Sequence, residues 1–144
     1  MLELVHMLSK SDSETKEYAR NLVRDLKGPT VLALDGELGA GKTTFVQGLA
    51  EELGIEKRVL SPTFVFLRSY NLENPKFKKF HHFDLYRCRS LADVKSIGFE
   101  EVLGEEGSLV VIEWPEVARV LLPKNTRWIK IRKVGENERE IEVS

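Results

Sequence analysis

The residues with the clearest chemical potential form a glycine-rich stretch near position 40. Residues 36–43, Gly-Glu-Leu-Gly-Ala-Gly-Lys-Thr, fit the pattern G-x-x-x-x-G-K-[ST] at every fixed position. In such a phosphate-binding loop (P-loop), glycines let backbone N–H groups fold around phosphate oxygens, and the next helix points its positive end at the same anion. The lysine then reaches the β- and γ-phosphates, and the threonine hydroxyl ligates Mg²⁺. The sequence therefore predicts a nucleoside triphosphate site.

We expect the entire loop to contact the nucleotide. Its members are Gly36, Glu37, Leu38, Gly39, Ala40, Gly41, Lys42, Thr43 and Thr44. Without nucleotide, the Lys42 side chain is expected to face solvent, so that its removal leaves the fold intact. The chain contains no Asn-Lys-x-Asp run of the kind that reads guanine, and this favours ATP over GTP.

Two acidic residues compete for the metal and for catalysis. Glu113 ends an apolar run at residues 109–112, and Asp84 lies within or at the end of a strand predicted at residues 80–86. A P-loop enzyme usually needs an acid at a strand end, where the carboxylate holds Mg²⁺ or its water. Spacing alone leaves both candidates open. It also leaves open that either carboxylate pairs with a nearby Arg or Lys.

The elements that position these residues alternate between strands and helices. Apolar periodicity predicts strands at residues 2–8, 30–34, 64–70, 80–86, 109–112, 126–134 and 138–143, and helices at residues 11–26, 42–53, 91–97 and 115–122. Ser11 and Glu14 have the spacing of a capping box at the start of the first helix. This alternation predicts an α/β fold: a P-loop NTPase-like three-layer sandwich around a mixed, mainly parallel central sheet.

Length and charge limit the classes of function. The 144 residues fit one domain, which we take as residues 1–144. With 22 Lys and Arg against 23 Asp and Glu, the net charge of −1 argues against a protein that grips DNA or RNA by itself. No run approaches 18 apolar residues, so we expect no membrane segment and a cytoplasmic location.

Three functions are compatible with a P-loop in this setting. The first is an ATPase whose hydrolysis drives a conformational or assembly cycle. The second is a small-molecule kinase, for which the only candidate lid is residues 71–79, a segment with Lys but no Arg. The third is a nucleotide-regulated binding module with negligible turnover, in which ATP only selects a conformation.

Four short runs together resemble one family. They are residues 36–44, Ser-Pro-Thr-Phe at 61–64, His-Phe-Asp-Leu-Tyr-Arg at 82–87 and Glu-Trp-Pro-Glu at 113–116. Their order and spacing are similar to those of the TsaE (formerly YjeE) family of bacterial ATPases, and the resemblance covers essentially the whole chain. That family assists synthesis of the threonylcarbamoyladenosine modification, next to the anticodon in tRNA.

The resemblance implies a Mg²⁺-dependent ATPase with low intrinsic turnover, whose ATP binding and hydrolysis drive the cycle of the TsaB–TsaD pair. TsaD transfers the threonylcarbamoyl group, so tRNA would be reached only through the complex, and no DNA or membrane partner is implied. By the same resemblance, Lys42, Asp84 and Glu113 are catalytic. Thr43 and the two acids serve the metal.

The resemblance also implies roles for residues outside the loop. Thr63 would act as a switch-like residue that senses the γ-phosphate, although Ser-Pro-Thr as a bare sequence is usually just a turn. Trp114 would lie near the nucleotide, and Asp12 and Arg139 are candidates for the adenine side. Residues 76–82 interleave basic and aromatic side chains that could touch RNA, but a solvated edge strand explains them equally well.

Overall fold

A central sheet organises the computed structural model, which describes residues 5–56 and 65–144. Within these residues the sheet has seven strands in the order β1-β7-β6-β2-β5-β4-β3. The inner neighbours β6, β2, β5 and β4 are parallel, whereas β1, β7 and β3 join antiparallel at the two sides. The predicted α/β sandwich with a mixed, mainly parallel sheet is confirmed.

The strands are β1 (Val5–Ser9), β2 (Thr30–Asp35), β3 (Leu67–Asn71), β4 (Lys79–Asp84), β5 (Ser108–Glu113), β6 (Arg127–Lys133) and β7 (Arg139–Val143). The helices are α1 (Asp12–Asp25), α2 (Lys42–Glu52), α3 (Leu91–Ser96), α4 (Phe99–Leu103) and the 3₁₀-helix η1 (Pro115–Leu121). None of the helices in the described ranges combines the length and the apolar character needed to cross a membrane.

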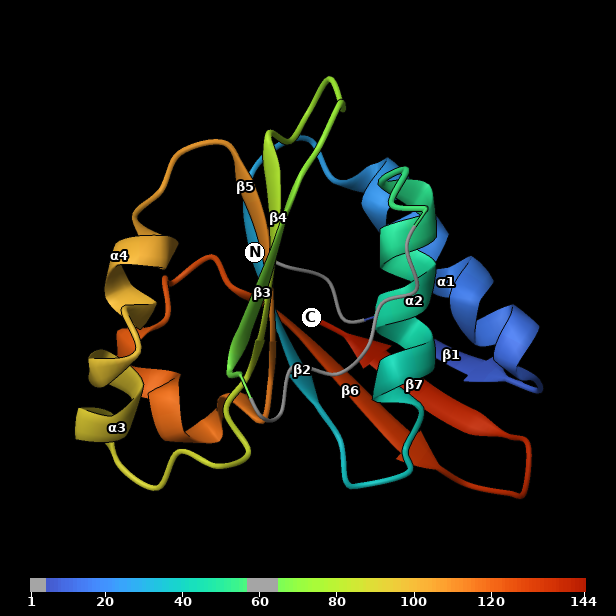
Figure 1. Ribbon diagram of the computed structural model, residues 1–144. Helices are drawn as coiled ribbons and strands as arrows, with labels where there is room; N and C mark the ends of the chain where they lie inside the picture. Colours follow the sequence, from blue (N-terminus) through green and yellow to red (C-terminus); the bar gives the residue numbers. More distant parts are fainter. Residues whose placement is uncertain (1–4, 57–64) are drawn as a thin grey trace.

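Helices cover both faces of the sheet (Figure 1). α1 and α2 pack on one face, and α3, α4 and η1 pack on the other. On the first face α1 and α2 approach closely at Gly48, where a Cβ would stand 2.6 Å from the Lys16 carbonyl oxygen. On the second face the rings of Phe83 and Phe99 pack with centroids 4.8 Å apart. Because both faces are covered, the inner strands form a rigid base for the loops at their ends.

The starts of α1 and α2 differ in a way that matters for binding. At α1 the predicted cap is confirmed, since Ser11 Oγ accepts from the Glu14 N–H (3.1 Å) and Glu14 Oε2 accepts from the Lys10 N–H (3.0 Å). α2 begins after Gly41, with no side-chain cap and no acidic residue in its first turn. The first amides of α2 therefore have no capping side chain as a partner, which favours an anion there.

Within the described residues, two strand boundaries differ from the sequence-based prediction by more than one residue. β3 begins at Leu67 rather than at residue 64, because Phe66 takes a left-handed conformation (φ 63°) that an extended strand cannot include. Residue 64 itself, like residues 1–4 of the first predicted strand, lies outside the described residues. β4 ends at Asp84 rather than at Tyr86, since Asp84 Oδ1 accepts from the Tyr86 N–H (2.9 Å) and turns the chain.

The helix α4 was not predicted from the sequence. It follows Gly98, which has a positive φ of 77° and separates α4 from α3. Both helices are short, and α4 contributes the buried ring of Phe99 to the core. This pair, with η1, closes the face of β4 and β5 opposite α2 and so fixes the ends of those two strands.

Candidate functional site

A pocket of about 540 Å³ opens at the carboxyl ends of β4 and β5, next to the loop that joins β2 to α2. It is lined by Asp12, Leu38, Gly39, Gly41, Lys42, Thr43, Thr44, Asp84, Tyr86, Glu113, Trp114 and Arg139. This volume is within the range of sites that take small molecules, and ligands of open α/β sheets bind at this edge. Most of the site residues predicted from the sequence are thus brought together in one cavity.

Three predicted residues of the loop do not line this pocket. Gly36, Glu37 and Ala40 line a neighbouring hollow of about 520 Å³ on the β6 side of the loop, and Trp114 borders both cavities. Thr63 lies outside the described residues, so its switch-like role stays a prediction.

The β2–α2 loop has a conformation that requires glycine. Gly39 (φ 78°) and Gly41 (φ 103°) adopt left-handed conformations that penalise a side chain. Gly36 lies against β6, where a Cβ would stand 2.7 Å from the Ile131 carbonyl oxygen. The spacing of the glycines in the sequence therefore reflects three separate steric demands of this loop.

Lys42 is buried, with 6% of its surface exposed, so the prediction that it faces solvent is wrong. Its ammonium donates to the Gly36 carbonyl oxygen (2.5 Å) and lies 3.5 Å from the centre of the Trp114 ring. Burial lowers the pKa of Lys42, while the negative charges of Glu113, Asp84 and Asp35 oppose that shift. The lysine folds back because a carbonyl dipole, an aromatic face and nearby carboxylates all attract its charge.

Asp84 and Glu113 are direct neighbours across β4 and β5. They are paired in the parallel register and both are buried, with 2% and 3% exposure. Paired residues of adjacent strands point to the same face of a sheet, and here that face carries α2 and Lys42. The prediction that both acids lie at strand ends is confirmed. The register of β4 and β5 places the two carboxylates next to each other.

His82 and Tyr86 are site residues that sequence reasoning missed. His82 Nε2 lies 2.5 Å from Glu113 Oε2, and both side chains are buried. Tyr86 lines the pocket, with its ring centroid 5.0 Å from that of Trp114. Both belong to the run at residues 82–87 that carried the family resemblance, but their contacts depend on strand register and not on local spacing.

Trp114 holds an unusual backbone conformation. It has φ 57° and ψ 55°, in the left-handed region that a residue of this bulk rarely occupies. Pro115 follows it and opens η1, and a proline disfavours right-handed helical geometry in the residue before it. Strain of this kind concentrates at functional sites, and here it places the indole over the Lys42 ammonium.

Arg139 reaches the pocket from the start of β7. Its Nη1 donates to the Glu138 carbonyl oxygen (3.1 Å), and its buried Nε has no hydrogen-bond partner within residues 5–56 and 65–144. A Cβ on Gly41 would stand 3.2 Å from that Nε, so the guanidinium lies directly against the loop. Arg139 therefore offers a donor beside the loop for an anionic or polar ligand.

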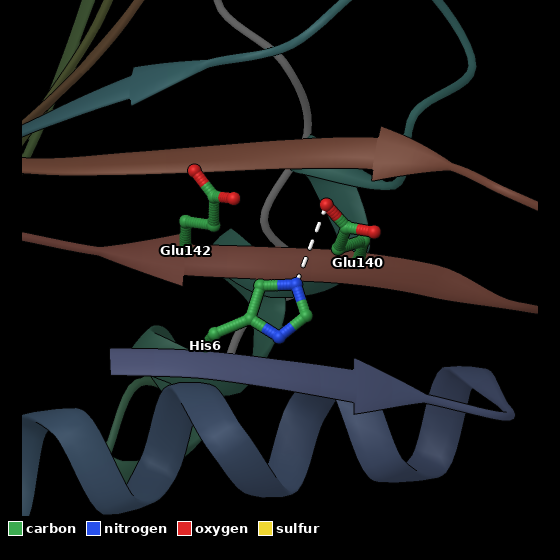
Figure 2. A group of neighbouring side chains, drawn as sticks. All are labelled: His6, Glu140 and Glu142. Carbon is green, nitrogen blue, oxygen red and sulfur yellow. Dashed lines mark ion pairs between the residues drawn. The ribbon is translucent and has the colours of Figure 1, made fainter. Parts of the chain in front are cut away.

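A second group of chemically capable side chains lies on β1 and β7, outside the pocket (Figure 2). His6 Nε2 is 3.3 Å from Glu140 Oε1, and Glu142 lies beside them. The Arg132 guanidinium, which donates to Glu140 Oε1 at 2.8 Å, is the main cause that lowers the pKa of Glu140, and His6 adds to it. Because the Arg132 guanidinium already neutralises the negative charge of Glu140, we interpret the group as an ion-pair network on the sheet.

Residues 76–82 are used to hold the fold together. Lys76 Nζ donates to the Val23 and Leu26 carbonyl oxygens (2.8 and 2.7 Å) at the end of α1. The aromatic rings of Phe77 and Phe80 are buried. The interpretation as a solvated edge strand is wrong, because β4 lies between β5 and β3 and its residues 80–84 are buried. The proposed contact with RNA stays a prediction.

Fold and pocket together define an α/β protein with a glycine-rich loop at the carboxyl edge of a parallel sheet, facing two buried acids. The family model for "Threonylcarbamoyl adenosine biosynthesis protein TsaE" matches residues 9–141. This chain belongs to that family, which takes part in tRNA threonylcarbamoyladenosine biosynthesis.

Individual relatives agree with this assignment. The protein of this name from Treponema pallidum is 38% identical over 137 residues, which cover 95% of this chain and 98% of the relative. That from Bacillus subtilis is 38% identical over 128 residues, covering 89% of this chain and 77% of the relative. The crystal structure of YdiB from Bacillus subtilis superposes with a TM-score of 0.78 at 33% identity, over 99% of this chain and 86% of that one.

Proposed function

We propose that this chain binds ATP with Mg²⁺ in the pocket beside the β2–α2 loop and hydrolyses it, as an accessory subunit in tRNA threonylcarbamoyladenosine synthesis. The observation that carries the proposal is the convergence of Lys42, Asp84 and Glu113 at the uncapped start of α2. An uncapped helix start and a glycine loop attract phosphate. A lysine and two carboxylates supply the remaining groups that phosphoryl transfer needs.

Lys42 has a double role in this proposal. In the structure its ammonium is held by the Gly36 carbonyl and the Trp114 ring. When ATP binds, Lys42 leaves these partners and pairs with the β- and γ-phosphates, where charge-assisted hydrogen bonds are stronger than its bond to a carbonyl. Arg139 then contacts the nucleotide from the other side of the loop, and Asp12 lines the same pocket.

The residues present fit a Mg²⁺ ion. Thr43 offers a hydroxyl, and Asp84 and Glu113 offer carboxylates in the same pocket, all oxygen donors of the kind that Mg²⁺ prefers. When bound, Mg²⁺ neutralises phosphate charge. Glu113, which is hydrogen-bonded to His82, orients the attacking water, and Asp84 holds the metal side of the pocket.

One observation weakens the kinase alternative. The candidate lid at residues 71–79 forms the turn between β3 and β4. A hydrogen bond from the Leu72 N–H to the Lys78 carbonyl oxygen (2.9 Å) closes this turn. This turn lies at the end of the sheet opposite the β2–α2 loop (Figure 1), so it cannot close over the pocket. The nucleotide-regulated binding module remains the alternative, and turnover measurements separate it from an ATPase.

We propose TsaB- and TsaD-type subunits as the partners, with tRNA reached through them. ATP would favour the conformation that docks, so association with the TsaB–TsaD pair is expected to be tighter with ATP than with ADP. The isolated chain should bind tRNA weakly and without preference over other RNA. Sedimentation or calorimetry with each nucleotide measures both. Equal affinity for the TsaB–TsaD pair with ATP and with ADP would rule out control of docking by the nucleotide. Tight, selective tRNA binding by this chain alone would contradict the proposal that the partner subunits recognise the tRNA.

Trp114 should report nucleotide binding directly. Because the Lys42 ammonium lies over the Trp114 indole in the structure, withdrawal of the ammonium on nucleotide binding is expected to change the emission of Trp114. Trp128, the other tryptophan, stacks on Arg119 on the opposite face, away from the pocket. The variant Trp128→Phe isolates the Trp114 signal, and Trp114→Phe serves as its control. ATP binding seen by calorimetry in Trp128→Phe without any emission change would refute the proposed movement of Lys42.

A further inference from the structure

We propose that His82 is a positioning residue, which fixes the orientation of the Glu113 carboxylate through one buried hydrogen bond; this role rests on the proposed ATP hydrolysis. The imidazole Nε2 lies 2.5 Å from Glu113 Oε2, and both side chains are buried. The hydrogen bond holds one carboxylate oxygen, Oε2, and so fixes the plane in which the second oxygen points. His82 does not line the pocket, and it therefore acts only through Glu113.

The sheet register creates this contact. His82 is paired with Val111, and Glu113 lies two residues further along β5 on the same face. The imidazole and the carboxylate have 1% and 4% of their side-chain surface exposed. The ring of Phe80, two residues earlier in β4 and on the same face, stacks on the imidazole with centroids 6.3 Å apart and an interplanar angle of 25°. Packing against Phe80 and burial therefore fix the orientation of the imidazole, which in turn fixes the Glu113 carboxylate.

The contact with Glu113 also determines which ring nitrogen of His82 acts as the donor. An ionised carboxylate only accepts hydrogen bonds, so Nε2 carries the proton that it donates to Glu113. Nδ1 is buried and has no hydrogen-bond partner in the described part of the chain. The geometry therefore places a hydrogen on Nε2 and identifies Nε2 as the donor to Glu113.

The neighbouring histidine offers a matched control. His81 is equally buried in the same strand, but it faces the opposite side of the sheet, where its Nδ1 lies 2.7 Å from Ser69 Oγ. Loss of the His82 imidazole removes a buried hydrogen bond, and loss of the His81 imidazole removes a partly buried one together with a 3.4 Å contact to Glu105. Only the loss at His82 should affect turnover.

The test compares His82→Phe, His82→Gln and His81→Phe by steady-state ATP hydrolysis and by nucleotide affinity. We expect His82→Phe to lower kcat by about 10–100-fold, the usual cost of losing a group that orients a catalytic or metal-binding side chain, with KM and nucleotide affinity little changed. His82→Gln, whose amide nitrogen can replace Nε2, should restore most of kcat. His81→Phe should keep the kcat of the unmodified protein, whatever its thermal stability.

The outcomes separate this inference from the proposed function. Nucleotide binding without any turnover in the unmodified chain contradicts both. Normal turnover with an unchanged kcat in His82→Phe contradicts the positioning role alone. Where His82→Phe does not fold, NMR of ¹⁵N-histidine-labelled protein decides. We expect hydrogen on Nε2, with a downfield proton signal that moves in Glu113→Gln, and hydrogen on Nδ1 instead would overturn the inference.

Discussion

Replacing Lys42 with alanine is expected to abolish ATP hydrolysis and to weaken nucleotide binding. Its ammonium is the cation at the start of α2 and lies beside both acids. Loss of a group that stabilises transition-state charge typically costs about 10²–10³-fold in kcat, and the loss of ground-state contacts to phosphate adds to it. Calorimetry with ATP and ADP, together with a phosphate-release assay, measures both effects.

The control for Lys42→Ala is Lys95→Ala, which removes an exposed lysine from α3. Because Lys42 is buried beside Glu113 and Asp84, its removal takes a positive charge away from two buried carboxylates, and we also expect a lower melting temperature. Turnover in Lys42→Ala is therefore compared at a temperature where circular dichroism shows the variant folded. Unchanged hydrolysis by the folded variant would remove the phosphate-loop assignment.

Glu113→Gln is expected to lower turnover by about 10²–10⁴-fold, the range typical of a lost acid–base group, with a smaller loss of nucleotide affinity. The amide keeps the shape of the side chain but loses the negative charge that would orient the attacking water. Single-turnover hydrolysis with saturating ATP isolates this effect from binding.

Two further variants calibrate the effect of Glu113→Gln. Asp84→Asn retains an oxygen that can accept from the Tyr86 N–H, and its expected loss of turnover is smaller. Glu101→Gln removes an exposed carboxylate from α4 and should change nothing. A severe loss in Asp84→Asn beside a mild loss in Glu113→Gln would reverse the ranking of the two acids.

The parts of the molecule that could be predicted from sequence have local signals. The glycine spacing of the β2–α2 loop and the Ser11–Glu14 cap each lie within one short run of chain, and both have the predicted form. The acid Glu113 was found because an apolar run stops at it. α4 was missed because five residues after Gly98 are too few to show helical periodicity.

The contacts that complete the site are long-range, and no local pattern encodes them. His82 meets Glu113 across 31 residues only because β4 and β5 are paired in one particular register. Lys42 is buried because Trp114 takes a left-handed conformation that places its ring over the ammonium. Spacing identified the chemical groups, and the sheet and this strained residue determine how they face one another.

ATP turnover by the purified chain is the most direct test of the central claim that this pocket binds and hydrolyses ATP. ADP release is measured with Mg²⁺ for the chain alone and after addition of the TsaB–TsaD pair, with Lys42→Ala assayed in parallel to exclude contaminating activity. We predict slow turnover by the chain alone, loss of that turnover when Mg²⁺ is chelated, and faster turnover with the pair. ADP release no greater than that of Lys42→Ala, both alone and with the pair, would contradict the account.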